Sequence, residues 1–448
     1  MIEIEPVAKR YAWGSRTRLQ RLFRLDSSDA GPRAAGPLAE MWFSGHAGSP
    51  SLLRPASGAP IPLDEAIRRD PDAMVGPVVS RAYGPVLPYL FKIIAARVPL
   101  SLQVHPVGFE ARAGFHREQS AGVPVDAPER SFRDTLAKHE MVVALGSFAA
   151  SVGFLPPDLA ARALAGVNHP LAVRMARALG GGDAGDVGRD AMMPDAAIAW
   201  PESRRRLFRA FRTAVTAGPG EASGIADALH RALGRMTDRA RVGLALEHAL
   251  VAAEAFPGDP SVMALALMNP MRLKDGDAVF IPAGQPHAYL HGMAAEIMTN
   301  SDNVLRAGMT VKHRDIPNLL RSLDCAPAVP IDPRVGGDGG EGAAARTDGS
   351  PVSPWLTAYR PPIDAYALTY GRIGDFAGAT GFDLPQRGPR VLLCLDGRLR
   401  CSDDEGARTL ERGDAMFIPA GAGGLAVERL DDPSGGRRGA FLLAATPF

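Results

Sequence analysis

One nine-residue motif occurs twice in this 448-residue chain. Residues 276–284 read GDAVFIPAG, and residues 413–421 read GDAMFIPAG. A Gly-Asp pair before four apolar residues predicts a tight turn that leads into a buried β-strand, and Pro-Ala-Gly predicts a second turn. The two copies lie far apart in the chain, so they predict two β-barrels of similar construction rather than one repeated hairpin.

The repeated hairpin resembles the jelly-roll hairpin of cupin-type barrels. We therefore expect a mainly β fold with two cupin-like jelly-roll barrels and an inserted α-helical domain. The expected segments are a catalytic barrel in two parts (1–154 and 267–325), an inserted helical domain (155–266), a flexible linker or loop (326–354) and a C-terminal barrel (355–448).

Helical periodicity marks the inserted segment. An Ala/Leu/Arg-rich helix is predicted from Pro156 to Leu179, and further helices are predicted over residues 202–215, 222–235 and 241–254. His230 and His248 are spaced as on an exposed helix face, so we expect no site there. Residues 326–354 are rich in Gly, Pro, Ala and Asp and lack apolar periodicity, which is typical of a linker.

Composition excludes several classes of function. The net charge is +1, which gives no general attraction to nucleic acid or to an acidic membrane. No apolar run is long enough to span a bilayer, and the first residues lack the basic start and apolar core of a signal peptide. The three cysteines form no Cys-x-x-Cys spacing, so we expect reduced thiols in a cytoplasmic protein.

Four residues are candidate metal ligands. Gln103 and His105 alternate on a predicted strand, so their side chains project from the same face about 7 Å apart. Glu140 and His287 lie in later stretches, and His287 follows the Pro-Ala-Gly turn of the first repeat. Two imidazoles, a carboxylate and an amide oxygen suit Zn²⁺ with an open position. The second repeat has Gly424 in place of this histidine, so only the first barrel is expected to hold a metal.

Polar and charged residues crowd the stretch after the metal histidine. Structural salt bridges would explain part of this density. Four cations in and before this stretch would instead suit a phosphorylated substrate, because Arg supplies fork geometry and Lys a point charge: Lys92, Lys138, Arg306 and Lys312.

Several scattered runs give the chain a specific resemblance to the type I phosphomannose isomerase family. They occur in the family's order over residues 11–312, and the last two are the most specific. The runs are residues 11–14 (YAWG), 39–42 (AEMW), 91–93 (FKI), 101–106 (SLQVHP), 257–260 (PGDP), 286–290 (PHAYL) and 301–312 (SDNVLRAGMTVK).

The resemblance implies a metal-dependent aldose–ketose isomerase that interconverts mannose 6-phosphate and fructose 6-phosphate through a cis-enediol. It implies one Zn²⁺ per chain, held by the four candidate ligands named above. It also implies a substrate site that uses Lys92, Ser101, Lys138, Glu296 and Arg306. We add Trp13, Tyr289 and Lys312 to this site, because they lie in the matching runs.

The catalytic base remains open among three residues. Glu296 and Asp302 are carboxylate candidates, and Lys138 could serve if burial beside a cation lowers its pKa. Arg306 more plausibly stabilises negative charge than moves a proton, since a guanidinium stays protonated.

One segment departs from the family pattern. The family usually has Asn-His-Lys-Pro-Glu before its third ligand, whereas residues 136–140 read LAKHE. Ala137 therefore replaces the family histidine, and no proton-transfer role of that histidine can be carried over. His139 replaces the proline and is a rival metal ligand, although on a regular strand it would face away from Glu140.

Two other classes of function remain. The altered segment would fit a non-catalytic sugar-phosphate-binding cupin protein. A metal-dependent cupin oxygenase would use two His and one carboxylate on Fe(II), but Gln103 as a fourth ligand and the cationic cluster argue against it. We expect a small sugar phosphate as the binding partner, and a monomer or weak homo-oligomer.

Overall fold

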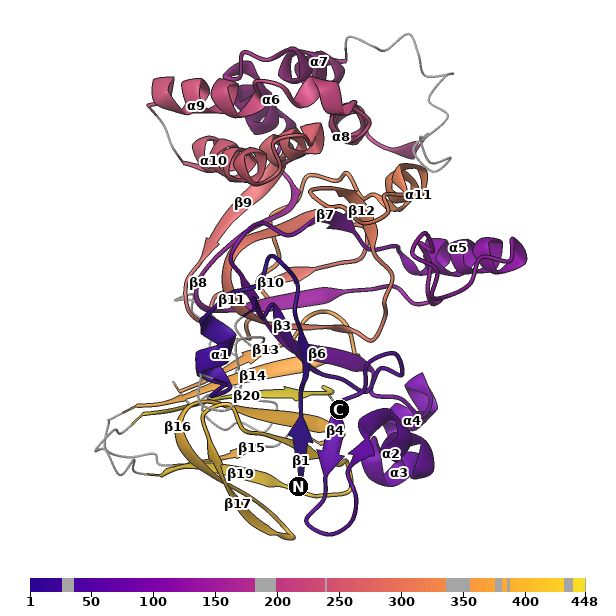
Figure 1. Cartoon of the computed structure of the whole chain (residues 1–448), viewed down its shortest axis with the longest axis vertical. Helices are drawn as coiled ribbons and strands as arrows, with labels where there is room; N and C mark the ends of the chain where they lie inside the picture. Colours follow the sequence, from indigo (N-terminus) through magenta and orange to yellow (C-terminus); the bar gives the residue numbers. More distant parts are fainter. Residues whose placement is uncertain are drawn as a thin grey trace.

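Three tiers lie along the long axis of the molecule, with helices at one end, a β-sheet in the middle and a second β-sheet at the other end (Figure 1). Within the described residues, the middle sheet has nine strands and the end sheet has eleven, so the fold is mainly β, as expected. The computed structural model describes residues 1–25, 36–181, 199–237, 240–335, 355–374, 381–384, 387–430 and 438–447.

The middle sheet is antiparallel, and its strands run in the order β10-β8-β11-β6-β3-β2, with β7, β9 and β12 paired beside this path. Buried apolar side chains fill nearly every position of β6 because β11 and β3 cover both its edges. The strands are β2 (Val7–Lys9), β3 (Glu40–Phe43), β6 (Tyr89–Ala96), β7 (Leu102–Val104), β8 (Glu140–Phe154), β9 (Met268–Leu273), β10 (Ala278–Ile281), β11 (His287–Thr299) and β12 (Leu305–Gly308).

The end sheet combines the C-terminal strands with three strands from the beginning of the chain. These strands are β1 (Ile2–Glu5), β4 (Leu52–Arg54), β5 (Ile61–Pro62), β13 (Leu356–Tyr359), β14 (Ala367–Ile373), β15 (Gly381–Leu384), β16 (Arg390–Asp403), β17 (Gly406–Glu411), β18 (Ala415–Ile418), β19 (Leu425–Leu430) and β20 (Gly439–Ala445).

The expected assignment of all of residues 1–154 to the first barrel is therefore wrong for β1, β4 and β5. β1 pairs with β18 through Ile2 opposite Phe417, and β4 pairs with β1. The physical reason is that β18 is apolar and needs a partner on each edge, and β16 covers only one. A fragment restricted to residues 355–448 would expose the other edge of β18.

The two copies of the repeated motif adopt the same turn. Gly276 and Gly413 have φ of 81° and 92°, in the left-handed region that favours glycine. The carboxylates of Asp277 and Asp414 each accept the backbone N–H three residues earlier at 2.9 Å. The following strands β10 and β18 then pair with the long strands β8 and β16. The repeat is thus present in structure as well as in sequence.

The described residues between β8 and β9 include five α-helices. They form the helical end of the molecule (Figure 1). The helices predicted over residues 202–215, 222–235 and 241–254 are present with nearly the expected bounds. The single helix predicted from Pro156 is instead two helices, because Pro170 cannot continue a helix and starts a new one. The helices are α6 (Pro157–Ala165), α7 (Pro170–Gly180), α8 (Glu202–Val215), α9 (Ile225–Arg235) and α10 (Arg241–Ala255).

One apolar core joins the two sheets, since Phe280 of β10 and Phe417 of β18 belong to the same buried cluster. Another core joins the helical end to the middle sheet. Among the described helices, none is both long and apolar enough to cross a membrane.

The remaining helices are α1 (Arg18–Leu22), α2 (Leu63–Arg69), α3 (Pro71–Met74), α4 (Pro77–Tyr83), α5 (Gly108–Ser120), α11 (Ile316–Ser322) and the 3₁₀ helices η4 (Pro219–Ala222) and η5 (Pro260–Leu267).

The predicted linker is described only in its first part, and residues 336–354 lie outside the described residues. Ile331 forms an antiparallel bridge with Phe280, and Pro327 forms a parallel bridge with Phe154. Residues 326–335 are therefore attached to the middle sheet by backbone hydrogen bonds, because the edge of β10 offers unpaired groups there, and this part is not a free linker.

His248 differs from the expectation of an exposed position. Its side chain is buried, and Nδ1 lies 2.9 Å from the hydroxyl of the buried Ser151 on β8. Burial lowers the pKa of His248 to about 4, so the ring is neutral at pH 7. Nearly all neighbours of His248 on α10 are apolar, and this helix packs on both other helices and the sheet.

We expect His248→Ala to reduce the free energy of unfolding by about 1–3 kcal/mol, because the substitution leaves a cavity and an unpaired buried hydroxyl. Denaturant unfolding checks this value. The control is His230→Ala, whose ring is exposed, and which we expect to change stability by less than about 0.5 kcal/mol. Equal stability of the two variants would show that the buried contact contributes nothing.

Candidate metal and substrate site

Two histidines and one carboxylate meet where three strands of the middle sheet begin or end. His105 follows β7, Glu140 begins β8 and His287 begins β11. Nε2 of His105 lies 2.9 Å from one oxygen of Glu140, and Nε2 of His287 lies 3.2 Å from the other. The donor atoms lie within 4.8 Å of one another, and all three residues are buried. The described structure thus brings three predicted ligands into one cluster.

Backbone contacts determine which nitrogen of each ring carries the proton. Nδ1 of His105 lies 2.7 Å from the carbonyl oxygen of Asn303, and Nδ1 of His287 lies 3.1 Å from that of Gln285. A carbonyl can only accept, so Nδ1 of each neutral ring is protonated and Nε2 presents a lone pair. Both lone pairs face Glu140. This arrangement is repulsive without a cation, and carbonyl-anchored rings of this kind are usual in metal sites.

Gln103 lies beside this cluster, directly opposite His287 in the strand pairing. Its amide nitrogen is 3.0 Å from Nε2 of His287, and its amide oxygen accepts from the Ser101 hydroxyl at 3.3 Å. A 180° rotation of the Gln103 side-chain amide exchanges the positions of its oxygen and its nitrogen. The oxygen would then face the cluster while the NH₂ group donates to Ser101, so Gln103 fits as a fourth ligand.

The electrostatics of the cluster also suit a divalent cation. Burial lowers the pKa of His105 to about 3, so the imidazole is neutral at pH 7. Burial alone would raise the pKa of Glu140, but the nearby amine of Lys138 favours the ionised carboxylate and lowers this pKa. The amine of Lys138 lies 3.1 Å from this carboxylate. Neutral nitrogen donors and one carboxylate are ordinary zinc ligands.

A buried hydrogen-bonded chain extends from Glu140 into the sheet. The Tyr289 hydroxyl lies 3.2 Å from Glu140 and 2.8 Å from Glu296, and Glu296 lies 2.6 Å from the amine of Lys92. Glu40 lies on the other side of Lys92, at 3.9 Å. The ammonium of Lys92 is therefore paired with two carboxylates inside the sheet, and its expected role as a substrate cation stays a prediction. Tyr289 and Glu296 likewise face the ligand Glu140.

A second group of cations lies nearer the surface. Arg306 on β12 is opposite Gln103 in the strand pairing, and Lys312 lies 5.0 Å from the centre of the Tyr11 ring. Burial lowers the pKa of Arg306, and the neighbouring Arg133 lowers it further. Within the described residues, none of these three cations has a carboxylate at ion-pair distance. Sequence reasoning missed Arg133, which lies in the segment directly before the altered motif.

The remaining candidates line the same region. The Asp302 backbone N–H donates to Asp134 at 2.9 Å, and its carboxylate lies 3.5 Å from Nε2 of His46. Trp13 stacks on Tyr11 with ring centres 5.7 Å apart. Burial raises the pKa of Tyr11, and the carboxylates of Glu40 and Asp302 raise it further. Sequence reasoning missed Tyr11 and His46, although both lie in runs rich in aromatic and polar residues.

Known proteins share this combination of sequence and fold. Residues 1–157 match the family described as phosphomannose isomerase type I, catalytic domain. The mannose-6-phosphate isomerase of Salmonella typhimurium is 31% identical over 92% of each chain. The chain belongs to the type I phosphomannose isomerase family.

Other members of the family extend the comparison. Mannose-6-phosphate isomerase 1 of Arabidopsis thaliana is 27% identical over 92% of this chain and 88% of its own length. The solved Salmonella typhimurium enzyme, bound to fructose 6-phosphate and zinc, superimposes with a TM-score of 0.78 at 27% identity and covers both chains fully. A mannose 6-phosphate isomerase structure with zinc and yttrium has the same TM-score and identity.

The chain departs from the usual phosphomannose isomerase motif at Ala137 and at His139. Contacts in the structure explain the residue at position 139 only. Its Nδ1 accepts the Ala283 N–H at 3.1 Å, and its ring stacks on Phe280 with centres 6.0 Å apart. His139 therefore supports the turn before His287 and is not part of the ligand cluster. Nothing in the structure explains the replacement of the family histidine by Ala137.

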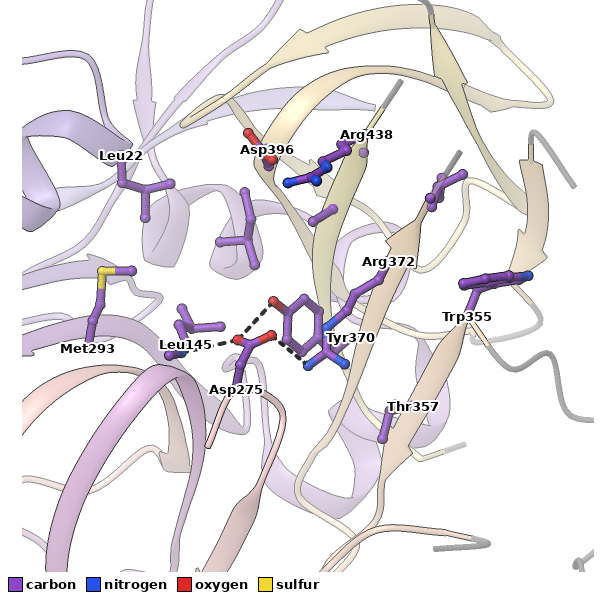
Figure 2. A pocket seen from close by; sticks show the side chains of 16 residues that line it. Leu22, Leu145, Asp275, Met293, Trp355, Thr357, Tyr370, Arg372, Asp396 and Arg438 are labelled. Atoms are coloured by element: carbon purple, nitrogen blue, oxygen red, sulfur yellow. Dashed lines mark hydrogen bonds and ion pairs between the residues drawn. The ribbon is translucent and has the colours of Figure 1, made fainter. Parts of the chain in front are cut away.

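A separate cavity of about 610 Å³ lies between the two sheets of this phosphomannose isomerase family member. Figure 2 shows Asp275 on the wall of this cavity, bound to both Tyr370 and Arg372. Arg372 and Arg438 lie on the side of the cavity that the end sheet forms. The lining includes no predicted site residue, and the positive and negative side chains balance. We assign the cavity to the contact between the sheets.

Proposed function

We propose that this chain is a zinc-dependent mannose-6-phosphate isomerase that interconverts mannose 6-phosphate and fructose 6-phosphate. The observation that carries the proposal is the pair of protonless Nε2 atoms facing Glu140 in a member of this family. The relative with fructose 6-phosphate and zinc bound supports the same substrate and metal.

The metal would be held by His105, Glu140, His287 and the turned amide of Gln103. When bound, zinc would supply positive charge that polarises the substrate's oxygen atoms and stabilises the enediolate. Tyr289 would hold Glu140 in place through its hydroxyl, because ligand carboxylates depend on such outer hydrogen bonds for orientation.

The proton transfer needs a base that can reach C1 and C2 of the open-chain sugar. Glu296 is 3% exposed and already paired with Lys92 and Tyr289, and Lys138 is close to Glu140. Asp302 has a carboxylate that is 35% exposed at the same region. We therefore assign Asp302 as the base, which takes the proton from C2 and returns it to C1 while a hydroxyl proton passes from O2 to O1.

The phosphate would be bound by Arg306, Lys312 and Arg133. These cations lack carboxylate partners among the described residues, unlike Lys92, so a dianionic group would relieve their mutual repulsion. Ser101 and Trp13 would contact the sugar, Ser101 beside Gln103 and Trp13 through its stack with Tyr11.

The finer architecture is also part of this proposal. The repeated turn supports two cupin-like jelly-roll barrels, of which the second lacks the metal histidine, and an inserted helical domain at 155–266. The described cysteines are all buried and unpaired, which supports a reducing, cytoplasmic location. A non-catalytic sugar-phosphate-binding protein is the alternative, supported only by the altered motif at residues 136–140.

An isomerase assay separates these functions. Purified protein is mixed with mannose 6-phosphate, and fructose 6-phosphate is followed before and after treatment with a chelator. We expect turnover that the chelator abolishes and added zinc restores. Binding of mannose 6-phosphate without turnover in zinc-loaded protein would instead establish the non-catalytic alternative.

A further inference from the structure

His46 lies beside the carboxylate assigned as the base but belongs to no part of the site described so far. It follows β3 of the middle sheet, and its Nε2 lies 3.5 Å from Oδ2 of Asp302. The two side chains are 27% and 35% exposed, so both remain partly accessible at the edge of the site.

The His46 ring is held in one orientation and one tautomer. Its Nδ1 accepts the backbone N–H of Gly48 at 3.2 Å, and its own backbone N–H donates to the buried hydroxyl of Ser44 at 3.0 Å. A nitrogen that accepts cannot also carry the proton of a neutral imidazole, so the proton is on Nε2. This N–H faces Asp302. A Cβ at Gly48 would lie 3.3 Å from the ring, so glycine leaves room for it.

Within the part of the chain that the structure describes, the other contact that holds Asp302 is made by its backbone. Its N–H donates to Asp134, and Asp134 also accepts from Ser301 and Asn303. Among the described residues, His46 is the side-chain partner that the structure gives to the Asp302 carboxylate. Without it, the carboxylate would be free to rotate about χ1 and χ2 on a partly exposed loop.

We propose that His46 is a positioning residue for Asp302, whose Nε2–H holds one carboxylate oxygen so that the other faces the carbon atoms of the substrate. The proposal rests on the isomerase function proposed above. The distance of 3.5 Å is longer than a hydrogen bond, and such contacts commonly shorten when substrate binds. His46 would contribute by orienting the base. Loss of His46 should therefore lower kcat rather than raise KM.

A second histidine–carboxylate pair offers a matched control. His230 and Glu254 lie 3.0 Å apart on the exposed face of the helical end, with both side chains more than half exposed. An exposed pair of this kind contributes little to stability or function. Any effect specific to His46 must therefore come from its place beside Asp302.

The test compares His46→Ala, His46→Gln and His230→Ala in the zinc-loaded full chain. We expect His46→Ala to lower kcat by about 10- to 100-fold with KM changed less than about threefold. Glutamine places an amide N–H where Nε2–H was, so His46→Gln should keep kcat within about fivefold of the parent protein. His230→Ala should match the parent.

A double-mutant cycle decides whether His46 acts through Asp302. In an Asp302→Asn background, His46→Ala should have little further effect, because the group that it positions has lost its function. A normal kcat in His46→Ala, equal losses in the Gln and Ala variants, or a full further loss in the Asp302→Asn background would each overturn the proposal. Absence of isomerase activity in the zinc-loaded parent protein would instead overturn the proposed function.

Discussion

Replacing His287 by alanine is expected to remove the metal and abolish isomerase activity. His287 supplies one of the two protonless imidazole nitrogens that face Glu140. A zinc site binds with ~10–16 kcal/mol in all, so losing one of four ligands should weaken binding by roughly 100- to 1000-fold. Zinc affinity is measured by competition with a chromophoric chelator.

The matched control for this variant is His230→Ala, which should retain full metal and full activity. Unfolding curves of the His287→Ala protein are recorded to ensure that the fold is kept. Metal content and turnover equal to the parent in folded His287→Ala protein would remove His287 from the ligand set, and with it the assignment of the metal site to the middle sheet.

Asp302→Asn is expected to lower kcat by about 100- to 10,000-fold while zinc remains bound. Asparagine has the same size but cannot accept a proton from carbon, so the variant removes general base catalysis and little else. Among the described residues, the contact from this segment to a ligand ring is made by the carbonyl group of Asn303 and not by the Asp302 carboxylate. Steady-state kinetics and metal analysis on the same preparation measure both quantities.

Two variants distinguish this role from that of the buried groups. Lys138→Ala should lower metal affinity together with kcat, because its amine lies 3.1 Å from the ligand Glu140. Glu296→Gln should disturb its ion pair with Lys92 and reduce stability as well as rate. Near-normal turnover in Asp302→Asn, with a large loss confined to kcat in Glu296→Gln or Lys138→Ala, would move the base to that residue.

Local patterns predicted those features that local chemistry determines. The Gly-Asp turn was predictable because a positive φ favours glycine and a short carboxylate can accept the N–H three residues earlier, and both copies do so. The three helices from residue 202 onward were predictable from apolar periodicity. The break at Pro170 followed from the missing N–H of proline, but one continuous helix was predicted there.

Contacts between distant segments were not predictable in this way. The pairing of β1 with β18 depends on which edge of β18 is left uncovered once β16 has paired with it. The burial of His248 depends on a helix that packs on more than one side. The ion pair of Lys92 with Glu296 depends on the register between β6 and β11, which places these two residues opposite each other.

The candidate site shows the same division. Spacing and the family resemblance indicated Gln103, His105, Glu140 and His287 as ligands, and these four side chains lie together. The tautomers could not be predicted, because they depend on the carbonyl groups of Asn303 and Gln285. Arg133 was missed because an isolated Arg in a loop has no distinguishing sequence pattern. His46 was missed because its aromatic and polar run does not show that the ring lies beside Asp302.

The most direct test of the account is to locate the metal. Crystals of protein purified without added metal are measured at X-ray energies just above and just below the zinc absorption edge. We predict one strong zinc-specific anomalous peak per chain, bounded by Nε2 of His105, Nε2 of His287 and the Glu140 carboxylate. A catalytically active protein without zinc at this position, or with its metal elsewhere in the chain, would contradict the central claim.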